Sequence, residues 1–495
     1  MRSDQAQSIT AASRCRLLTA CVGPFTTHRN ITVRFHIVVI ALLIAVELSA
    51  QAGSHTSATV PVPERTRGTA LSTTRQRFTG AAPAIPGTPA GEALRAWIAA
   101  FNSADTAQLG AYARHFERDV IVSDELGFRE QTGGFTLVSI ERSERRHLEF
   151  IVRERKSPMT AYGMIDMSAG APIRVAARRF QPLGPHVGAN ALRVDAAVRA
   201  RTVTTAAALL DTFYVSPDMA QRAGDTLRAR SERGAYRRYG NGVALAMRLG
   251  DDLAALTQDK HLHLMYSVDV LPAAPRTGAR RSAEDSVRER TRLTGMKCGF
   301  DKAEVLADNV GYVKLDMFAD PEFCAAAASA AMTDVAATRA LILDLRDNGG
   351  GEPSMVTYIA SYLFDRCTHL NDLWTRRTGR TEEFWTRDSV PGARFGGTKP
   401  VYVLTSSRTF SGGEEFAYDL QQLRRATVVG ETSGGGAHPM SSHRIGGHFM
   451  MTVPFARPVN PVTHTNWEGV GVVPDLKVPA EDALAATLKR LGRGE

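Results

Sequence analysis

The sequence is poor in cysteine. It has five cysteines in 495 residues, two near the N-terminus and three widely spaced further on: Cys15, Cys21, Cys298, Cys324 and Cys367. No C-x-x-C pair or other metal-ligand spacing is present, which argues against a metal site, and we expect no cofactor. One disulfide can form in an oxidising compartment, but the spacing does not select the pair.

Clusters of positive charge are also missing. The formal net charge is +9, but the excess is spread along the chain, and the densest basic stretch, residues 276–292, also contains Glu284, Asp285 and Glu289. A nucleic-acid surface requires clustered basic residues with interleaved aromatic residues. We therefore expect no nucleic-acid partner and interpret the basic residues as a solvated surface.

The apolar run near the N-terminus is too short to span a membrane comfortably. Residues 37–46 are apolar, whereas a span needs about 20 such residues. The run follows a polar, arginine-bearing start and precedes Ala50-Gln51-Ala52, an order typical of a secretory signal. An uncleaved anchor is the alternative. We expect residues 1–52 to be a signal peptide, with no stable membrane span after processing and a periplasmic or secreted protein.

Composition and periodicity divide the rest of the chain. Residues 53–90 are rich in Ala, Thr, Pro, Ser and Gly and predict a flexible linker. In residues 91–184 a helical pattern is followed by alternating strand patterns, which predicts a small α+β accessory domain. The segments "WIAAFNSAD" and "FREQTGGF" weakly resemble the nuclear-transport-factor-two-like type of domain.

Residues 194–270 have apolar residues at helical spacing and end in a strand-like segment. In residues 303–480 short apolar runs alternate with helical patterns, which predicts an α/β fold: a largely parallel sheet with flanking helices. The helical segment is expected to precede this sheet as a small bundle.

The segment "LTSSRTFSGGEE", residues 404–415, combines a strand end with a helix start. Ser411 lies at this junction, where free amide groups of a helix N-terminus can stabilise developing negative charge. A serine there can attack a carbonyl carbon. The alternative is that Ser411 only caps the helix, since Glu414 completes a capping-box pattern.

Three further segments accompany this one in a fixed order: "LILDLRDNGGG" before it, and "VVGETSGGGAHP" and "NWEGVGVVPDL" after it. Together they resemble the tail-specific, or C-terminal-processing, serine peptidases over residues 194–478. The most similar branch contains interphotoreceptor retinoid-binding protein and the core of tricorn protease. The resemblance implies a crotonase-like peptidase core and a protein or peptide substrate.

The resemblance also implies residue roles. Ser411 is the nucleophile, His261 in "DKHLHL" the base, and Glu468 a residue that orients the catalytic network. Gly436 stands where the processing branch has a lysine base, so that Ser-Lys dyad is absent. Lys260 stands where the tricorn-like branch has a serine next to its histidine.

The oxyanion donors implied are the backbone N–H of Gly412 and one from the glycine turn, with Gly349 and Gly350 as candidates. Asp347, Glu414 and Glu431 are expected to brace loops. His263 is a rival base, followed by His438 and His443. About 35 residues separate Leu271 from Leu306, roughly half of what a PDZ module needs, so we expect none.

The sequence therefore predicts an exported serine-type endopeptidase and leaves its oligomeric state open. Two alternatives remain. One is a non-catalytic binding protein for an apolar ligand that uses the same fold. The other is a hydrolase that acts on a non-peptide ester or amide.

Overall fold

The computed structural model describes residues 83–118, 120–272 and 282–492. The expected signal peptide and most of the expected linker lie outside these residues. Within the described part of the chain, no helix is both long and apolar enough to cross a membrane.

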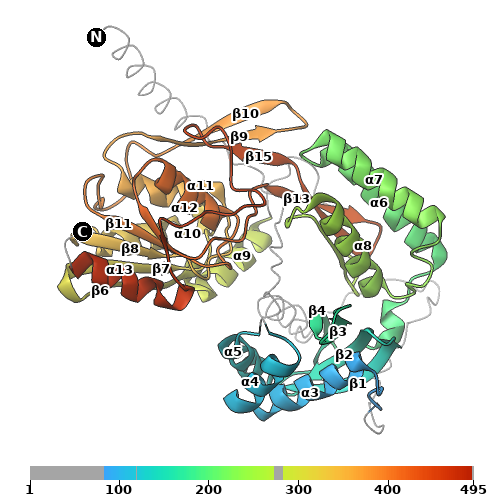
Figure 1. The fold of residues 1–495 in the computed structure, drawn as a ribbon. Helices are drawn as coiled ribbons and strands as arrows, with labels where there is room; N and C mark the ends of the chain where they lie inside the picture. The colour runs from blue at the N-terminus through green and yellow to red at the C-terminus, as the bar shows by residue number, and fades with distance from the viewer. Residues whose placement is uncertain (1–82, 119, 273–281, 493–495) are drawn as a thin grey trace, which may run out of the picture.

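The first unit is an antiparallel sheet with helices on one face (Figure 1). Its strands pair in the order β1-β2-β3-β4. The helices are α3 (Pro89–Ser103), α4 (Thr106–His115) and α5 (Val122–Thr132), and the strands are β1 (Phe135–Ser143), β2 (His147–Glu154), β3 (Met159–Met167) and β4 (Val175–Pro185). Buried Trp97, Phe101 and Phe135 lie in the core between helices and sheet.

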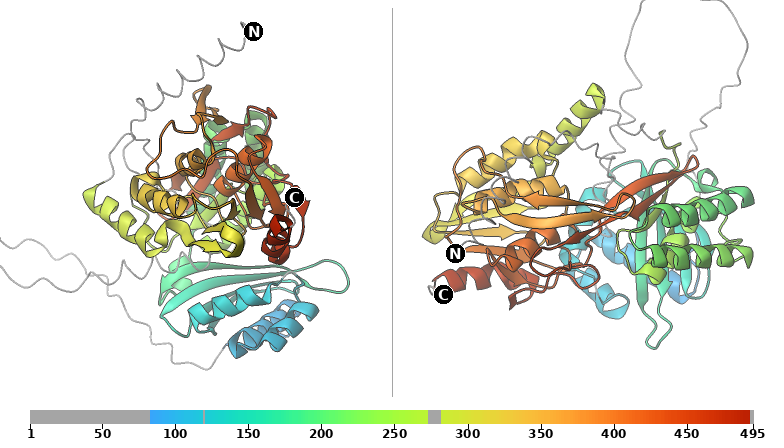
Figure 2. Two further views of the ribbon diagram at one scale, coloured as in Figure 1. Left: turned by 90° about the vertical axis from the view of Figure 1, so that its left-hand side faces the viewer. Right: turned by 90° about the horizontal axis from the view of Figure 1, so that it is seen from above.

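The other face of this sheet contacts the helical segment. In Figure 2 the sheet lies between its own helices and the rest of the chain. Ile151 of β2 and Tyr162 of β3 are fully buried in one apolar cluster with Leu210 and Tyr214. Gln181 donates a hydrogen bond to the carbonyl of Tyr266 at 2.6 Å. The accessory unit thus shares apolar contacts with the segment that follows it.

The helical segment consists of α6 (Ala196–Phe213), α7 (Pro217–Glu232) and α8 (Gly242–Thr257), as the periodicity predicts. The strand that follows, β5 (His263–Tyr266), joins a sheet in the order β13-β14-β5 with β13 (Met440–Ile445) and β14 (Phe449–Pro454). Backbone pairing between β5 and β14 therefore joins this segment to a part of the chain far along the sequence.

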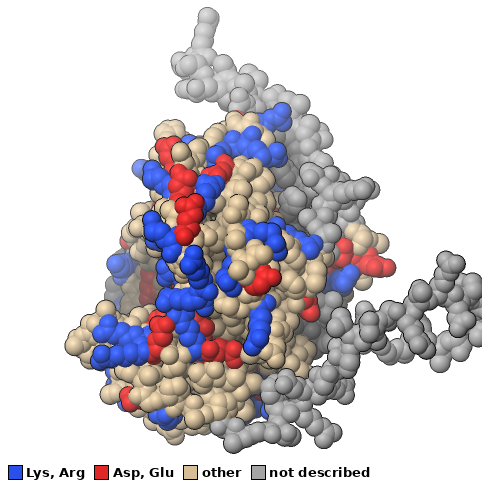
Figure 3. Space-filling view, turned by 90° about the vertical axis from the view of Figure 1, so that its right-hand side faces the viewer, with Lys and Arg blue, Asp and Glu red and all other residues tan. Residues whose placement is uncertain are grey.

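Charged residues of both signs are interspersed on the face shown in Figure 3. Arg228 of α7 pairs with Asp211 of α6, and Arg179 of β4 pairs with Asp251 of α8. On this face the basic side chains are therefore accompanied by carboxylates and do not form a stripe of one sign.

A six-stranded sheet forms the centre of the C-terminal region, in the order β16-β12-β11-β8-β7-β6. All pairings are parallel except β6 with β7. The strands are β6 (Phe300–Leu306), β7 (Val310–Leu315), β8 (Ala340–Asp344), β11 (Val401–Thr405), β12 (Thr427–Gly430) and β16 (Leu476–Lys477). All five residues of β8 and of β11 are buried, as expected for parallel strands covered on both faces.

Helices cover both faces of this sheet, which confirms the predicted fold class. Alternate residues of β8 and β11 pack on one face against α10 (Pro321–Asp334), α11 (Pro353–Ala360) and α12 (Gly412–Gln422). The intervening residues pack on the other face against α13 (Ala483–Gly492). Because β8 and β11 are parallel neighbours, the segments that follow them begin at the same edge of the sheet.

Two further features complete this region. A small antiparallel sheet, in the order β10-β9-β15, contains β9 (His369–Thr375), β10 (Arg380–Trp385) and β15 (Ala456–Val459). A disulfide joins Cys298 to Cys324, a pairing that the sequence left open. The described residues between Leu271 and Leu306 form one helix, α9 (Ala283–Gly295), a short 3-10 turn and strand β6.

Candidate active site

Ser411 occupies the sharp turn between β11 and α12. Its backbone has φ 53° and ψ −122°, a conformation that costs a non-glycine residue energy and is therefore held by its surroundings. Gly350, in the turn after β8, packs directly against it. A Cβ added to Gly350 would lie 2.6 Å from Ser411 Cβ and 2.8 Å from Gly412 N, so only glycine fits there.

Glu414 connects Ser411 to a second glycine turn, which contains Gly434, Gly435 and Gly436. Its Oε2 accepts hydrogen bonds from the N–H groups of Ser411 at 2.8 Å and Gly436 at 2.9 Å. Its Oε1 accepts from Ser433 Oγ and from Gly435 N, both at 2.6 Å. Burial raises the pKa of Glu414 to about 7, although these hydrogen bonds act in the opposite direction. Glu414 therefore braces loops, as expected.

The N–H groups of the first glycine turn, which consists of Gly349, Gly350 and Gly351, differ in their hydrogen-bond partners. Gly349 donates to the carbonyl of Asp316 at 3.1 Å, and Gly350 donates to Asn348 Oδ1 at 2.7 Å. Within the described residues no such partner is found for the N–H of Gly351. That nitrogen is close to helix α12, because a Cβ on Gly412 would lie 3.1 Å from it. Gly351 and Gly412 therefore bring their backbones together beside Ser411.

His261 lies against the residue that precedes the nucleophile. Its ring packs on Phe410 with the ring centroids 4.7 Å apart. Gly436 leaves room for both rings, since a Cβ there would lie 2.2 Å from Phe410 Cζ and 2.8 Å from His261 Cε1. The space that a lysine side chain at position 436 would need is thus filled by the two rings.

The backbone of His261 is fixed on both sides. Its N–H donates to Asp259 Oδ1 at 3.0 Å, and its carbonyl accepts from Thr452 Oγ1 at 2.7 Å. Its Nδ1 is buried and has no hydrogen-bond partner among the described residues, and no hydrogen bond there joins the ring to Ser411. Burial lowers the pKa of His261 to about 4, against the influence of Asp259. The imidazole is therefore neutral near pH 7, as a general base requires.

The other candidate histidines differ in their surroundings. His443 accepts or donates a hydrogen bond with Ser441 Oγ at 2.7 Å, and its ring packs on Phe213 with centroids 4.2 Å apart. His263 lies on β5, where its backbone N–H donates to Thr452 Oγ1 at 3.0 Å. Burial lowers the pKa of His263 as well.

His438 belongs to a cluster that the sequence analysis did not identify. Its Nδ1 is 2.8 Å from Asp259 Oδ2 and 3.6 Å from Glu468 Oε2. Glu468 Oε2 also accepts from Ala437 N at 2.5 Å, and Asp259 Oδ2 accepts from Tyr214 Oη at 3.2 Å. The three side chains come from separate segments, and the only signal for the cluster in the sequence was the role in orienting the catalytic network that the resemblance implies for Glu468.

The charges in this cluster are mutually dependent. Burial would raise the pKa of Asp259, but the hydrogen bond and charge of His438 hold it below the ordinary value. The pKa of His438 is raised by Asp259 in spite of burial. Burial and the charge of Asp259 raise the pKa of Glu468. One potential ligand atom from each of the three side chains lies within 4.8 Å of the other two, a spacing that could also hold a metal ion. The hydrogen bond to Asp259 already uses His438 Nδ1.

Lys260, at the position where the resemblance implies a serine, contacts the second glycine turn. Its Nζ donates a hydrogen bond to the carbonyl of Gly434, in the second glycine turn. Lys260 thus fastens this turn, while Asp259 and His438 are the neighbours of Glu468.

Two stretches of the chain match known protein families. Residues 309–478 match peptidase family S41, and residues 190–290 match the N-terminal domain of Peptidase_S41 in eukaryotic IRBP. Carboxyl-terminal-processing peptidase 2, chloroplastic, from Arabidopsis thaliana is 28% identical over 230 residues, which are 44% of this chain. The match spans only 42% of the length of that relative.

Solved structures show similar proteins at lower identity. The photosystem II D1 C-terminal processing protease is 18% identical, with a TM-score of 0.37, and the match covers 58% of this chain and 94% of that one. The tricorn protease is 13% identical, with a TM-score of 0.36, covering 71% of this chain and 40% of that one. These two sequence matches assign the helical segment and the α/β region, residues 190–290 and 309–478, to peptidase family S41.

Proposed function

We propose that this protein is a serine endopeptidase with Ser411 as nucleophile and His261 as base. The observation that carries the proposal is the arrangement around the 410–412 turn. Ser411 is held at positive φ at the start of α12, with the glycine turn on one side and the His261 ring packed on Phe410. A histidine far from this turn would instead have favoured a non-catalytic binding protein.

In the proposed reaction, Ser411 Oγ attacks the carbonyl carbon of the scissile bond while His261 accepts its proton. The carbonyl oxygen becomes an oxyanion, stabilised by N–H groups at the helix start. His261 then gives the proton to the leaving amine, and the C–N bond breaks to leave an acyl-enzyme. A water molecule, deprotonated by His261, attacks the acyl carbon; the bond between this carbon and Ser411 Oγ then breaks, His261 returns the proton to Ser411 Oγ, and the acid product leaves.

The oxyanion donors we propose are the N–H groups of Gly412 and Gly351. From the sequence we expected Gly412 and one glycine of the 349–351 turn, with Gly349 and Gly350 as candidates; Gly351 of the same turn takes their place in this proposal. Both of those N–H groups already donate hydrogen bonds, Gly349 to the carbonyl of Asp316 and Gly350 to Asn348 Oδ1. Gly350 instead provides the close approach to Ser411 that no larger residue allows.

We propose that Glu468 acts on His261 through its neighbours. Asp259 uses one oxygen to hold the backbone N–H of His261 and the other to hold His438. His438 in turn faces Glu468. Asp259 and His438 are therefore positioning residues in this proposal, in place of the serine that the resemblance implies.

We also propose that the protein is exported and acts in the periplasm or outside the cell. The leader-like residues 1–52 support this, and so does the Cys298–Cys324 disulfide, because such bonds persist in oxidising compartments. Fractionation of cells that express the full chain tests the proposal. Recovery of the intact N-terminus from the cytosol would contradict it.

Labelling with a fluorophosphonate tests the catalytic proposal without a known substrate. The probe should modify Ser411 in the full chain, and Ser411→Ala should abolish both labelling and peptide hydrolysis. Ser407→Ala is the matched control, since Ser407 is an exposed serine of the same loop and should keep both activities. Full hydrolysis by a correctly folded Ser411→Ala variant would refute the assignment.

A further inference from the structure

Asn348 is a fully buried polar residue that immediately precedes the first glycine turn. Its Oδ1 accepts the N–H of Gly350 at 2.7 Å, and its Nδ2 donates to the carbonyl of Leu315, at the end of β7, at 2.8 Å. Its own carbonyl accepts the N–H of Phe410, the residue before the nucleophile, at 2.9 Å. Asn348 therefore connects strand β7, the first glycine turn and the nucleophile turn.

Helix α12 packs directly on the Asn348 amide. A Cβ on Gly413, in the first turn of this helix, would lie 2.7 Å from Asn348 Oδ1 and 3.2 Å from Asn348 Cγ. A buried amide whose donor and acceptor are both used is held firmly, because moving it would leave polar groups unpaired. The amide thus fixes the distance between the glycine turn and the helix that begins at Ser411.

The backbone of Gly351 is oriented by a bridge to Phe318. The Phe318 N–H donates to the carbonyl of Gly350 at 2.7 Å, and the Glu352 N–H donates to the carbonyl of Phe318 at 2.8 Å. Because the two neighbours of Gly351 make these bonds, its own N–H points away from Phe318. Gly412 approaches the Gly351 nitrogen, since a Cβ on Gly412 would lie 3.1 Å from it.

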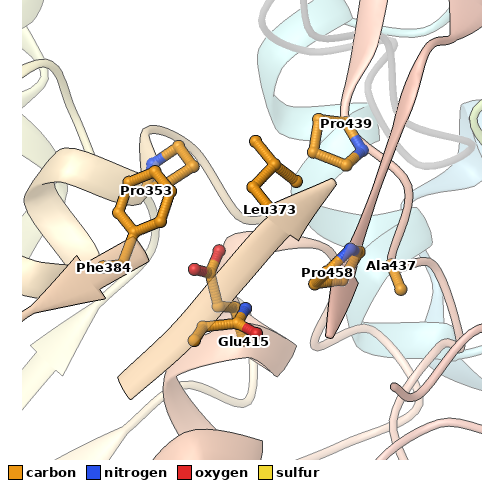
Figure 4. Close-up of a pocket in the computed structure, with 8 residues that line it drawn as sticks. Pro353, Leu373, Phe384, Glu415, Ala437, Pro439 and Pro458 are labelled. Carbon is orange, nitrogen blue, oxygen red and sulfur yellow. The ribbon is translucent and has the colours of Figure 1, made fainter. Parts of the chain in front are cut away.

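The chain beyond the turn is also fixed. Pro353 begins α11 and lines a small pocket together with Phe384 and Glu415 of α12 (Figure 4). Its ring fixes φ and so limits the movement of the backbone there. Within the turn, Gly350 has φ 100° and Gly351 has φ 137°, and glycine itself does little to restrict such conformations. The hydrogen bonds to the turn therefore decide which way its peptide groups point.

We propose that Asn348 is a positioning residue for the oxyanion site. By holding the Gly350 N–H, it leaves the Gly351 N–H as the donor that faces the reacting carbonyl oxygen. By holding the Phe410 N–H, it also fixes Ser411 relative to that donor. The inference rests on the proposed peptidase function and adds to it a residue that acts through its neighbours and does not touch the substrate.

Saturation kinetics of fluorophosphonate labelling test this role, because they separate the maximal rate at Ser411 from the affinity for the probe. Asn348→Ala removes the acceptor for the Gly350 N–H. It should lower the maximal rate about 100-fold, the cost of a displacement of about 1 Å in a catalytic group, with the half-saturating concentration little changed. Asn348→Asp keeps the acceptor, and burial favours its protonated form, which can also donate to Leu315. It should label faster than Asn348→Ala.

Asn460→Ala is the matched control. Asn460 is a fully buried asparagine whose Oδ1 also accepts the backbone N–H groups of a turn, from Val462 at 3.0 Å and from Thr463 at 3.2 Å. Its loss should lower the unfolding temperature, as the loss of Asn348 does, but leave the maximal labelling rate unchanged. A merely structural role for Asn348 would give the two alanine variants the same labelling rate.

The outcomes separate this inference from the proposed function. If folded Asn348→Ala labels at the rate of the unmodified protein, or if folded Asn348→Asp labels no faster than Asn348→Ala, the role of Asn348 is refuted while labelling of Ser411 still supports the peptidase. Failure of the unmodified protein to label would refute the proposed function, and the inference with it.

If the variants do not fold, a crystal structure of the fluorophosphonate adduct of the unmodified protein decides. The phosphonyl oxygen should accept from the N–H groups of Gly351 and Gly412, with the Gly350 N–H still bound to Asn348. An adduct in which Gly350 donates to the phosphonyl oxygen instead would overturn the inference.

Discussion

Replacing Gly436 by alanine tests the packing that places His261 at the nucleophile. The new Cβ would lie 2.2 Å from Phe410 Cζ and 2.8 Å from His261 Cε1, whereas ordinary contact begins at 3.4 Å. Phe410 must therefore move by about 1.2 Å (3.4 minus 2.2) and the imidazole by about 0.6 Å (3.4 minus 2.8). His261 is only 5% exposed, so the imidazole in particular has little free space to move into.

A displacement of about 1 Å in a catalytic group can reduce the rate about 100-fold. We expect Gly436→Ala to reduce the second-order rate constant of fluorophosphonate labelling at Ser411 by about that factor. The assay needs no knowledge of the natural substrate, and thermal unfolding of the same samples reports whether the fold is kept.

Gly447→Ala is the matched control. Gly447 lies in the turn between β13 and β14, and a Cβ there would meet only Val270 Cγ1 at 4.0 Å, an open contact. It should label at the rate of the unmodified protein. If Gly436→Ala also labels at that rate while remaining folded, the His261–Phe410 packing does not position the base, and the proposed Ser-His mechanism fails.

Three further predictions follow from the site and the fold. Burial lowers the pKa of His261 to about 4, so the imidazole should gain its proton only as the pH falls towards that value. Labelling at Ser411 should therefore decline near pH 4, and a decline centred near pH 6.5 would contradict this. His438→Ala should lower kcat about 10- to 100-fold with KM little changed, since removal of a positioning partner costs about that much, and His443→Ala should have little effect; equal losses from both variants would argue against a specific role. Deletion of residues 91–184 should leave Ser411 reactive to the probe. It should lower the unfolding temperature, because Ile151 and Tyr162 belong to an apolar cluster with the helical segment. Failure of the truncated protein to fold would show that this unit belongs to the peptidase core.

The sequence was sufficient where the chemistry is local. The strand-to-helix junction at Ser411 and the glycine turns can be identified from a few consecutive residues, since positive φ and close backbone approach need particular residues at particular positions. The alternation of buried strands and helices likewise predicted the largely parallel sheet. The short strands β9, β10 and β15 escaped prediction, because their burial is partial and β15 pairs with β9 from a distant segment.

The tertiary structure alone decided how the site is assembled. His438 and Asp259 are 179 residues apart, and no local spacing relates them to Glu468. The use of the Gly349 N–H group depends on the carbonyl of Asp316, which the fold brings to that place from a segment 33 residues earlier in the chain. The sequence by itself determined the residue types that the chemistry needs and the backbone turns that hold them. Contacts between distant segments decide which of those groups lie together and which hydrogen bonds they make. Only the folded chain fixes these contacts.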